Sequence, residues 1–141
     1  MDYGTILAGA NDRYNLIMMS LAKILVVDDE ISLVQLCELV LKSAGYAVFG
    51  ALSGRQALRL VAEEEPDLVL LDVMMPGMDG IEVCRQIRSN LTSKKNPRII
   101  MYTADLRDST RQSSLAAGAD AFITKDIPIY DLPSRLNPYL S

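Results

Sequence analysis

The chain has 141 residues, of which 50% are hydrophobic, and it carries a formal net charge of −4 with no histidine. This length and composition suit one domain with a full hydrophobic core. The negative charge gives no general electrostatic attraction to nucleic acid or to anionic membranes, so we expect neither as a direct partner. Without histidine, the commonest general base and metal ligand is missing, and carboxylates, lysine and hydroxyls must carry any chemistry.

The first 22 residues precede the first predicted strand and mix glycine and polar residues with one small apolar patch. We interpret residues 1–22 as an extension and residues 23–141 as the domain. The extension is either a genuine arm or a leader that lies before a true start near Met18 and Met19. The last predicted helix ends the chain, which fits a stand-alone protein and one domain of a longer protein equally well.

From Lys23 onward, apolar runs of strand length alternate with segments of helical periodicity. This alternation is typical of a parallel sheet with helices on both faces. Four of the runs are almost continuously hydrophobic, as expected of strands that are covered on both faces. The predicted strands are 24–27, 47–49, 68–71, 99–102 and 121–124.

The first predicted helix has apolar residues at helical spacing and is followed by Gly45, which has the place of a C-cap glycine. Its predicted buried face consists of Leu33, Leu36, Cys37, Val40, Leu41 and Ala44. Capping-box spacings begin the second and third helices, at Ser53 with Gln56 and at Asp79 with Glu82. Their predicted apolar faces are Ala57, Leu60 and Val61, and then Val83, Cys84 and Ile87.

The fourth predicted helix, 105–117, is rich in serine and poor in large apolar residues. We therefore expect it to bury little surface and to be mobile. Gly118 follows it, and a short last helix is predicted over 133–140.

The two cysteines, Cys37 and Cys84, lie far apart without a CxxC motif, so we expect reduced core residues of a cytoplasmic protein. No apolar run approaches the roughly 18 residues that cross a bilayer.

Polar residues follow four of the predicted strands. Because parallel strands place their carboxyl ends along one edge of the sheet, these residues are expected to meet there. Three carboxylates would repel one another unless a hard divalent cation lies between them, and Mg²⁺ fits because it needs few protein ligands. The residues are Asp28 and Asp29 after the first strand, Asp72 after the third, Thr103 after the fourth and Lys125 after the fifth.

Each of these residues has an ordinary structural interpretation when it is taken alone. An aspartate such as Asp29 or Asp72 after a strand often caps a helix. Thr103 alone would be a turn or cap residue, and Lys125 alone a solvated loop lysine. The occurrence of all five at successive strand ends favours one shared site instead.

Residues 23–140 resemble the receiver domain of two-component response regulators. Four stretches carry the resemblance, and they are KILVVDD at 23–29, DLVLLDVMMPGMDG at 67–80, YTA at 102–104 and GADAFITK at 118–125. The resemblance implies a flavodoxin-like (βα)5 fold, doubly wound, with five parallel strands in the order 2-1-3-4-5. It also implies a role in phosphorelay signalling, with the chain assisting its own phosphorylation and dephosphorylation rather than acting as an ordinary enzyme.

The same resemblance implies a set of site residues. The phosphoacceptor is Asp72, the phosphoryl contacts come from Thr103 and Lys125, and Mg²⁺ is held by Asp28, Asp29, Asp72 and the main-chain carbonyl of Met74. Phosphorylation would move Thr103 and turn an aromatic residue inward on the last strand, where Phe122 stands. Phe122 is equally compatible with a plain core residue.

Partners also follow from the resemblance. The output face would comprise the helix 105–117, the strand 121–124 and the helix 133–140, and it would act on a downstream protein or output domain. Because the chain contains no histidine, the phosphoryl donor is a separate histidine kinase or phosphotransfer protein, or a small acyl phosphate.

Two positions depart from the family pattern. Asp126 replaces the proline that usually follows the lysine, so we predict a trans Lys125–Asp126 bond, since a cis bond here costs roughly 2.5–4 kcal/mol. Met74, two residues after the acceptor, has no polar group to orient water, and we hypothesise a long-lived phosphoryl group. The basic residues Lys94, Lys95 and Arg98 are interpreted as ordinary solvated surface.

Three other functional classes fit the sequence less well. A magnesium-dependent phosphatase of the haloacid-dehalogenase kind needs a second acid at the position of Met74 and a cap domain for which the chain has no room. A pseudo-receiver that only docks would be expected to lack the acceptor, the lysine or the acidic pair. A dinucleotide-binding domain would need a GxGxxG motif after the first strand.

Overall fold

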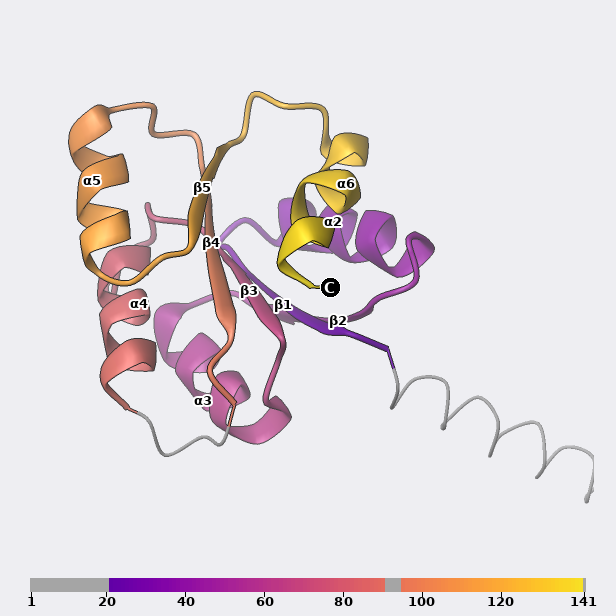
Figure 1. Cartoon of the computed structure of the whole chain (residues 1–141), viewed down its shortest axis with the longest axis horizontal. Helices are drawn as coiled ribbons and strands as arrows, with labels where there is room; N and C mark the ends of the chain where they lie inside the picture. The colour runs from indigo at the N-terminus through magenta and orange to yellow at the C-terminus, as the bar shows by residue number, and fades with distance from the viewer. Residues whose placement is uncertain (1–20, 91–94, 141) are drawn as a thin grey trace, which may run out of the picture.

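The computed structural model describes residues 21–90 and 95–140. Residues 1–20 of the predicted extension and Lys94 lie outside this range. The five strands pair in parallel in the order β2-β1-β3-β4-β5, which confirms the flavodoxin-like topology (Figure 1). The strands are β1 Lys23–Val27, β2 Ala47–Ala51, β3 Leu68–Leu71, β4 Arg98–Thr103 and β5 Ala121–Thr124.

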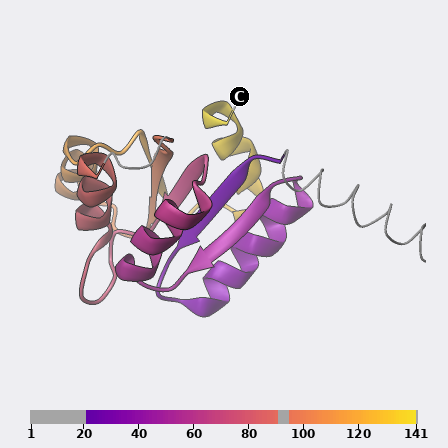
Figure 2. The same ribbon diagram turned by 90° about the horizontal axis from the view of Figure 1, so that it is seen from below.

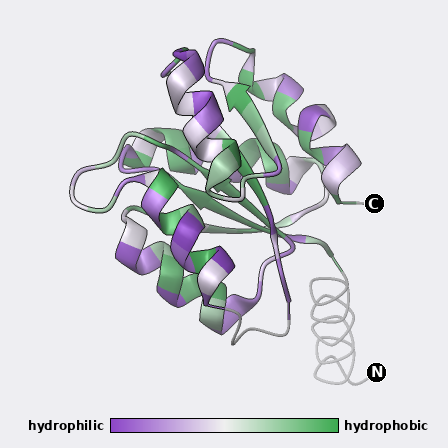
Figure 3. Ribbon diagram, turned by 60° about the vertical axis from the view of Figure 1, so that its left-hand side comes forward, coloured by the Kyte–Doolittle hydropathy of each residue, from purple (hydrophilic) through white to green (hydrophobic). Residues whose placement is uncertain are grey.

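Helices cover both faces of the sheet (Figures 1 and 2). One face packs against α2 (Ile31–Ser43) and α6 (Leu132–Leu136), and the other against α3 (Gly54–Glu64), α4 (Gly80–Ser89) and the region of α5 (Asp108–Ala116). Alternate side chains of each strand enter opposite layers, as the pleat requires. On β1, for example, Ile24 and Val26 face α2 while Leu25 and Val27 face α3. Figure 3 shows the hydrophobic strands enclosed between helices of mixed polarity.

The predicted helix caps are confirmed. The Ser53 hydroxyl accepts a hydrogen bond from Gln56 N at 3.2 Å, and Asp79 Oδ1 accepts one from Glu82 N at 2.9 Å. Each bond satisfies an amide that the first turn of a helix leaves without a partner. Gly45 follows α2 with φ of +99°, a conformation that glycine adopts without steric cost.

The predicted buried face of α2 is partly wrong. Leu36 is 43% exposed, whereas Val34, which lies outside the predicted face, is buried. The buried residues Val34, Cys37 and Leu41 follow one another at i, i+3 and i+7, so the helix is turned to place this stripe on the sheet. Both Cys37 and Cys84 are buried free thiols, as predicted.

The fourth predicted helix begins three residues later than expected, at Asp108 rather than at 105. Asp105 lies before the first turn, and its carboxylate accepts bonds from Arg107 N at 3.0 Å and from the Thr110 hydroxyl at 2.7 Å. The Asp105 carboxylate therefore stabilises the start of α5 through these two hydrogen bonds. The helix buries only Thr110 and Ser114, which confirms that it buries little surface, and its mobility stays a prediction.

The C-terminal segment is shorter and more irregular than the single helix predicted over 133–140. A 3₁₀ turn η1, Ile129–Asp131, leads into α6, and a second turn η2, Asn137–Tyr139, follows it. Pro138 has no N–H for a further α-helical bond, which accounts for the change of geometry. Within the parts that the structure describes, no helix has both the length and the apolar character needed to cross a membrane.

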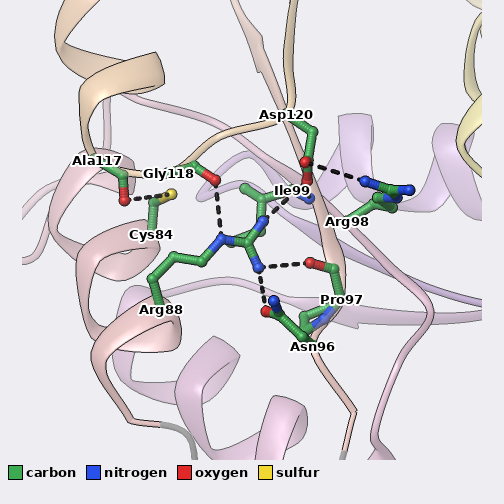
Figure 4. A network of polar contacts seen from close by, with 9 residues as sticks. All are labelled: Cys84, Arg88, Asn96, Pro97, Arg98, Ile99, Ala117, Gly118 and Asp120. Atoms are coloured by element: carbon green, nitrogen blue, oxygen red, sulfur yellow. Dashed lines mark hydrogen bonds and ion pairs between the residues drawn. The ribbon is translucent and has the colours of Figure 1, made fainter.

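The amino end of the sheet is held by a network centred on Arg88 at the end of α4 (Figure 4). Its guanidinium donates to the carbonyls of Gly118 (2.9 Å) and Pro97 (2.7 Å), and it pairs with Asp120 Oδ2 (2.9 Å). Asp120 in turn accepts a bond from Ile99 N at 2.8 Å. This network fixes the turn between α5 and β5 to α4 and β4, at the end of the sheet opposite the polar residues described next.

Candidate functional site

Sheet hydrogen bonding continues one step beyond three of the strands and fixes the residues that follow them. Asp28 N donates to Ala51 O at 3.1 Å, and Asp72 N donates to Val27 O at 2.9 Å. Lys125 N donates to Thr103 O at 2.9 Å. These bonds tie the main chain of Asp28, Asp72 and Lys125 to the end of the adjacent strand.

The three predicted acidic residues meet at this edge. Asp28, Asp29 and Asp72 each offer a carboxylate oxygen, and these oxygens lie within 4.8 Å of one another. Asp28 and Asp72 are only 2% and 5% exposed, whereas Asp29 is exposed. The amide of Glu30 donates to Asp28 Oδ1 at 2.9 Å and orients that carboxylate. All three acids line an open pocket of about 290 Å³, together with Met74, Thr103 and Lys125.

Lys125 supplies the positive charge of the pocket. Its Nζ lies 2.6 Å from Asp28 Oδ2 and 3.4 Å from Asp72 Oδ2. Burial alone would lower the pKa of Lys125, but the hydrogen bond to Asp28 and the charge of Asp72 raise it above its ordinary value. The ammonium is therefore a fixed cation at neutral pH.

Burial raises the pKa of the Asp72 carboxyl above its ordinary value, and the negative charge of Asp28 acts in the same direction. The positive charge of Lys125 opposes this rise, as does a hydrogen bond from Met74 N to Asp72 Oδ1 at 3.4 Å. The Asp72 carboxylate is thus poorly hydrated and depends on neighbouring charge. A carboxylate in this state benefits strongly from an added cation.

Thr103 and Lys125 reach the pocket from opposite faces of the sheet. Thr103 is two residues after Met101 on β4 and so belongs to the layer of α3 and α4, where Phe122 is paired with Met101. Lys125 is two residues after Ile123, which faces α2 and α6. Phe122 is partly buried against the α3 and α4 layer, so a core role and a mobile role both fit its position.

The donor set fits a hard divalent cation. All the acidic ligands are carboxylate oxygens, two of the three carboxylates are buried, and histidine and thiolate ligands are absent from the described pocket. This chemistry suits Mg²⁺ better than a softer transition metal.

The Lys125–Asp126 bond is trans, as predicted, because no peptide bond within the described residues is cis. Asp126 is exposed, and its carboxylate accepts a hydrogen bond from the Thr124 hydroxyl. Lys95, predicted to be solvated surface, forms a partly exposed ion pair with Asp67 at 2.9 Å, and Arg98 one with Asp120 at 3.4 Å.

Two contributors to the site were not singled out from the sequence. A Cβ built on Gly80 would lie 2.0 Å from Asp72 O, so only glycine allows α4 to begin directly against the main chain of Asp72. The Tyr102 ring lies under Lys125, with Nζ 5.8 Å from the ring centroid. Gly80 lies in one of the motifs that carry the family resemblance. The sequence alone does not show how closely Gly80 approaches the main chain of Asp72. Strand alternation from Lys125 would have placed Tyr102 on the same face.

A model of the response regulator receiver domain matches residues 24–137. The chain belongs to this family. The receiver domain is also similar to solved structures. The chemotaxis response regulator CheY4 of Vibrio cholerae is 33% identical, with 86% of this chain and 100% of that chain covered and a TM-score of 0.78.

Two further structures extend the comparison. The activated N-terminal receiver domain of Klebsiella pneumoniae RstA, described as BeF3-activated, is 34% identical over 84% of this chain and 97% of that chain, with a TM-score of 0.75. A CheY-like receiver domain protein from Methanospirillum hungatei is 30% identical over 86% of this chain and 94% of that chain, with a TM-score of 0.79. The receiver domain described here is therefore a signalling module of two-component systems.

Proposed function

We propose that Asp72 is the phosphoacceptor of this receiver domain and that Mg²⁺ assists its phosphorylation. One observation carries the proposal: a buried carboxylate, a lysine ammonium 3.4 Å from it and two further carboxylates share a single open pocket. The donor is a phosphohistidine of a separate kinase or phosphotransfer protein, or a small acyl phosphate, because the chain has no histidine of its own.

Asp28, Asp29, Asp72 and the main-chain carbonyl of Met74 would hold the ion. When bound, Mg²⁺ supplies positive charge that offsets the repulsion among the carboxylates and the phosphoryl oxygens. A carboxylate oxygen of Asp72 attacks phosphorus, the bond from phosphorus to the donor nitrogen or acyl oxygen breaks, and its electron pair leaves with the donor. Lys125 neutralises phosphoryl oxygens as charge develops on them.

Thr103 would respond to the phosphoryl group on Asp72 by turning its hydroxyl toward it. In the structure, the Thr103 hydroxyl accepts a bond from Asp105 N at 3.3 Å, so its reorientation toward a phosphoryl oxygen would release the segment before α5. Phe122 lies in the same layer and can move into space that Thr103 leaves. The output face would then be formed by α5, β5 and α6, and it would act on a downstream protein or output domain.

Incubation with acetyl phosphate and Mg²⁺, followed by intact-protein mass spectrometry, tests the proposal. We expect a mass increase of one phosphoryl group, and none in Asp72→Asn. Asp79→Asn is the matched control, because Asp79 belongs to the same loop but caps α4. Labelling of Asp72→Asn, or its absence from the unmodified protein, would contradict the assignment.

The same experiment separates a receiver from an aspartyl phosphatase. A receiver accumulates one stable phosphoryl group per chain, whereas a phosphatase releases phosphate continuously over many turnovers. Met74 stands where such phosphatases need a second acid, and it is 60% exposed with no polar group in its side chain. We therefore expect accumulation.

A further inference from the structure

Tyr102 and Lys125 lie on the same face of the sheet, at its carboxyl edge. Tyr102 is paired with Ile123 across β4 and β5, and Lys125 follows Ile123 by two residues. The ring is almost fully buried, at 4% exposed, in the layer that α2 and α6 cover. The ammonium lies 5.8 Å from its centroid, within the range in which a cation is attracted to an aromatic face.

The ammonium of Lys125 has two kinds of partner. These are the carboxylates of Asp28 and Asp72 and the face of the Tyr102 ring. Because the lysine side chain is 19% exposed, little water competes with the aromatic face. The preceding residue on the same face of β4, Ile100, is aliphatic, so Tyr102 is the residue through which this strand places an aromatic face near the sheet edge.

The Asp28 carboxylate and the Tyr102 ring, which both contact Lys125, differ in what happens to them during the proposed reaction. Asp28 is also a proposed ligand of Mg²⁺, and a carboxylate that turns to a divalent cation holds an ammonium less tightly. The ring contact does not involve Asp28 and therefore persists. Without the ring, Lys125 would keep only its longer contact with Asp72, at 3.4 Å, when its nearest partner, at 2.6 Å, is engaged elsewhere, and it would sample more rotamers.

We propose that Tyr102 is a positioning residue for phosphoryl transfer, whose ring keeps the Lys125 ammonium directed at Asp72 when Asp28 binds the cation. This inference rests on the proposed function of Asp72. The face of the ring contacts the ammonium, and the phenol hydroxyl takes no part in this contact. Tyr102→Phe should therefore position Lys125 as the unmodified protein does. Tyr102→Leu and Tyr102→pentafluorophenylalanine should not, because the first removes the ring and the second removes its negative face.

The contact itself is tested by NMR on metal-free protein, independently of any phosphorylation. The ε-methylene protons of Lys125 should show a ring-current shift that Tyr102→Phe retains and Tyr102→Leu abolishes. A Lys125 signal that is unchanged in Tyr102→Leu overturns the proposal. If the unmodified protein takes no phosphoryl group, the proposed function fails, while this measurement still decides the contact.

The consequence is tested by the rate of phosphorylation with acetyl phosphate at saturating Mg²⁺. We expect a loss of about fivefold in Tyr102→Leu and in the pentafluorinated variant, and a nearly unchanged rate in Tyr102→Phe. In a Lys125→Ala background, Tyr102→Leu should cause no further loss, because the ring acts through the lysine. An equal loss in both backgrounds would identify a purely structural effect and overturn the proposal. The pentafluorinated ring still fills the core and leaves no void of the kind that leucine would leave, so this result does not depend on how well Tyr102→Leu folds.

Discussion

The Nζ of Lys125 lies 2.6 Å from Oδ2 of Asp28, closer than to Asp72, although 97 positions separate the two residues in the chain. The ammonium of Lys125 therefore binds the same carboxylate, that of Asp28, that an incoming Mg²⁺ would bind. Before Mg²⁺ binds, the pocket is partly neutralised by the protein itself.

We predict that Lys125→Met binds Mg²⁺ several-fold more tightly than the unmodified domain but accepts a phosphoryl group more slowly. Removal of the ammonium frees Asp28 and leaves three carboxylates without a protein counter-charge, which favours a divalent ion. Phosphoryl oxygens would then lose one neutralising contact. Isothermal titration calorimetry measures the affinity, and an unchanged or weaker affinity for Mg²⁺ would refute the competition.

The raised pKa of Asp72 predicts a particular pH dependence of folding without metal. Because burial raises this pKa above its ordinary value of 3.8, the folded domain binds the proton more tightly than the unfolded chain does. The resulting stabilisation is fully present below pH 3.8 and is lost as the pH rises through the folded-state pKa. Asp72→Asn should therefore be more stable than the unmodified domain at pH 7, with the difference shrinking toward pH 3.5. Urea unfolding in chelator across this range checks the sign.

The side chain at position 74 should set the lifetime of the phosphoryl group. Met74 is exposed beside Asp72 and has no group that orients a water molecule for attack. We expect Met74→Asn to shorten the half-life by roughly tenfold, since positioned polar groups accelerate such steps by one or more orders of magnitude. Met74→Leu serves as control and should keep the long lifetime. Decay is followed by mass spectrometry after removal of donor, and equal half-lives in all three proteins would exclude this role.

Gly80 should be indispensable for the acceptor geometry. A Cβ at this position would lie 2.0 Å from Asp72 O and 3.0 Å from Val73 Cα, both main-chain atoms that cannot move alone. We expect Gly80→Ala to shift Asp72, to weaken Mg²⁺ binding at least tenfold, and to destabilise the fold by about 1–3 kcal/mol. Gly45→Ala is the control, because that site has open space and a strained φ of +99° but lies at the end of α2. It should lose stability and keep Mg²⁺ affinity.

The Arg88 network should contribute to stability without contributing to phosphorylation. Arg88→Ala removes a donor from the carbonyls of Gly118 and Pro97 and from Asp120, whose carboxylate keeps its contacts with Ile99 N and Arg98, so we expect a loss of about 2 kcal/mol. Arg85→Ala on the same helix removes only an exposed pair with Glu82 and should cost less than about 1 kcal/mol. Chemical denaturation measures both, and a phosphorylation rate altered by Arg88→Ala in folded protein would connect this end of the sheet to the site.

Local signals predicted most of the fold. Short apolar runs, four of them almost continuous, located all five strands. The hydroxyl of Ser53 and the carboxylate of Asp79 located the starts of α3 and α4, because capping depends on neighbours three residues away. The strand ends also located the acidic cluster and Lys125, since parallel strands must place these ends together. In contrast, the orientation of α2 depends on which of Val34 and Leu36 meets the sheet, and both fit a helical period.

The features that sequence could not supply depend on distances between separate elements. The sequence pattern predicts Asp105 as the first residue of a helix, but Asp105 lies before the first turn of α5 and bonds to the Thr110 hydroxyl there. Arg88 and Asp120 are 32 positions apart, and no local pattern relates them. The contact between Tyr102 and Lys125 requires both the β4–β5 register and the direction in which the lysine turns at the sheet edge.

The buried face of α5 carries hydroxyl groups instead of large apolar side chains, and this affects how the helix can move. Thr110 donates to Asp105, and Ser114 donates to the carbonyl of Thr110, and these are the only buried residues of the helix. Displacing a leucine-packed helix would open a void, whereas the Thr110 bond to Asp105 can be replaced by water when it breaks, and the Ser114 bond lies within the helix and moves with it. A small movement at the neighbouring Thr103, which accepts a bond from Asp105 N, would thus reorient this surface helix while the hydrocarbon interior of the domain stays closed.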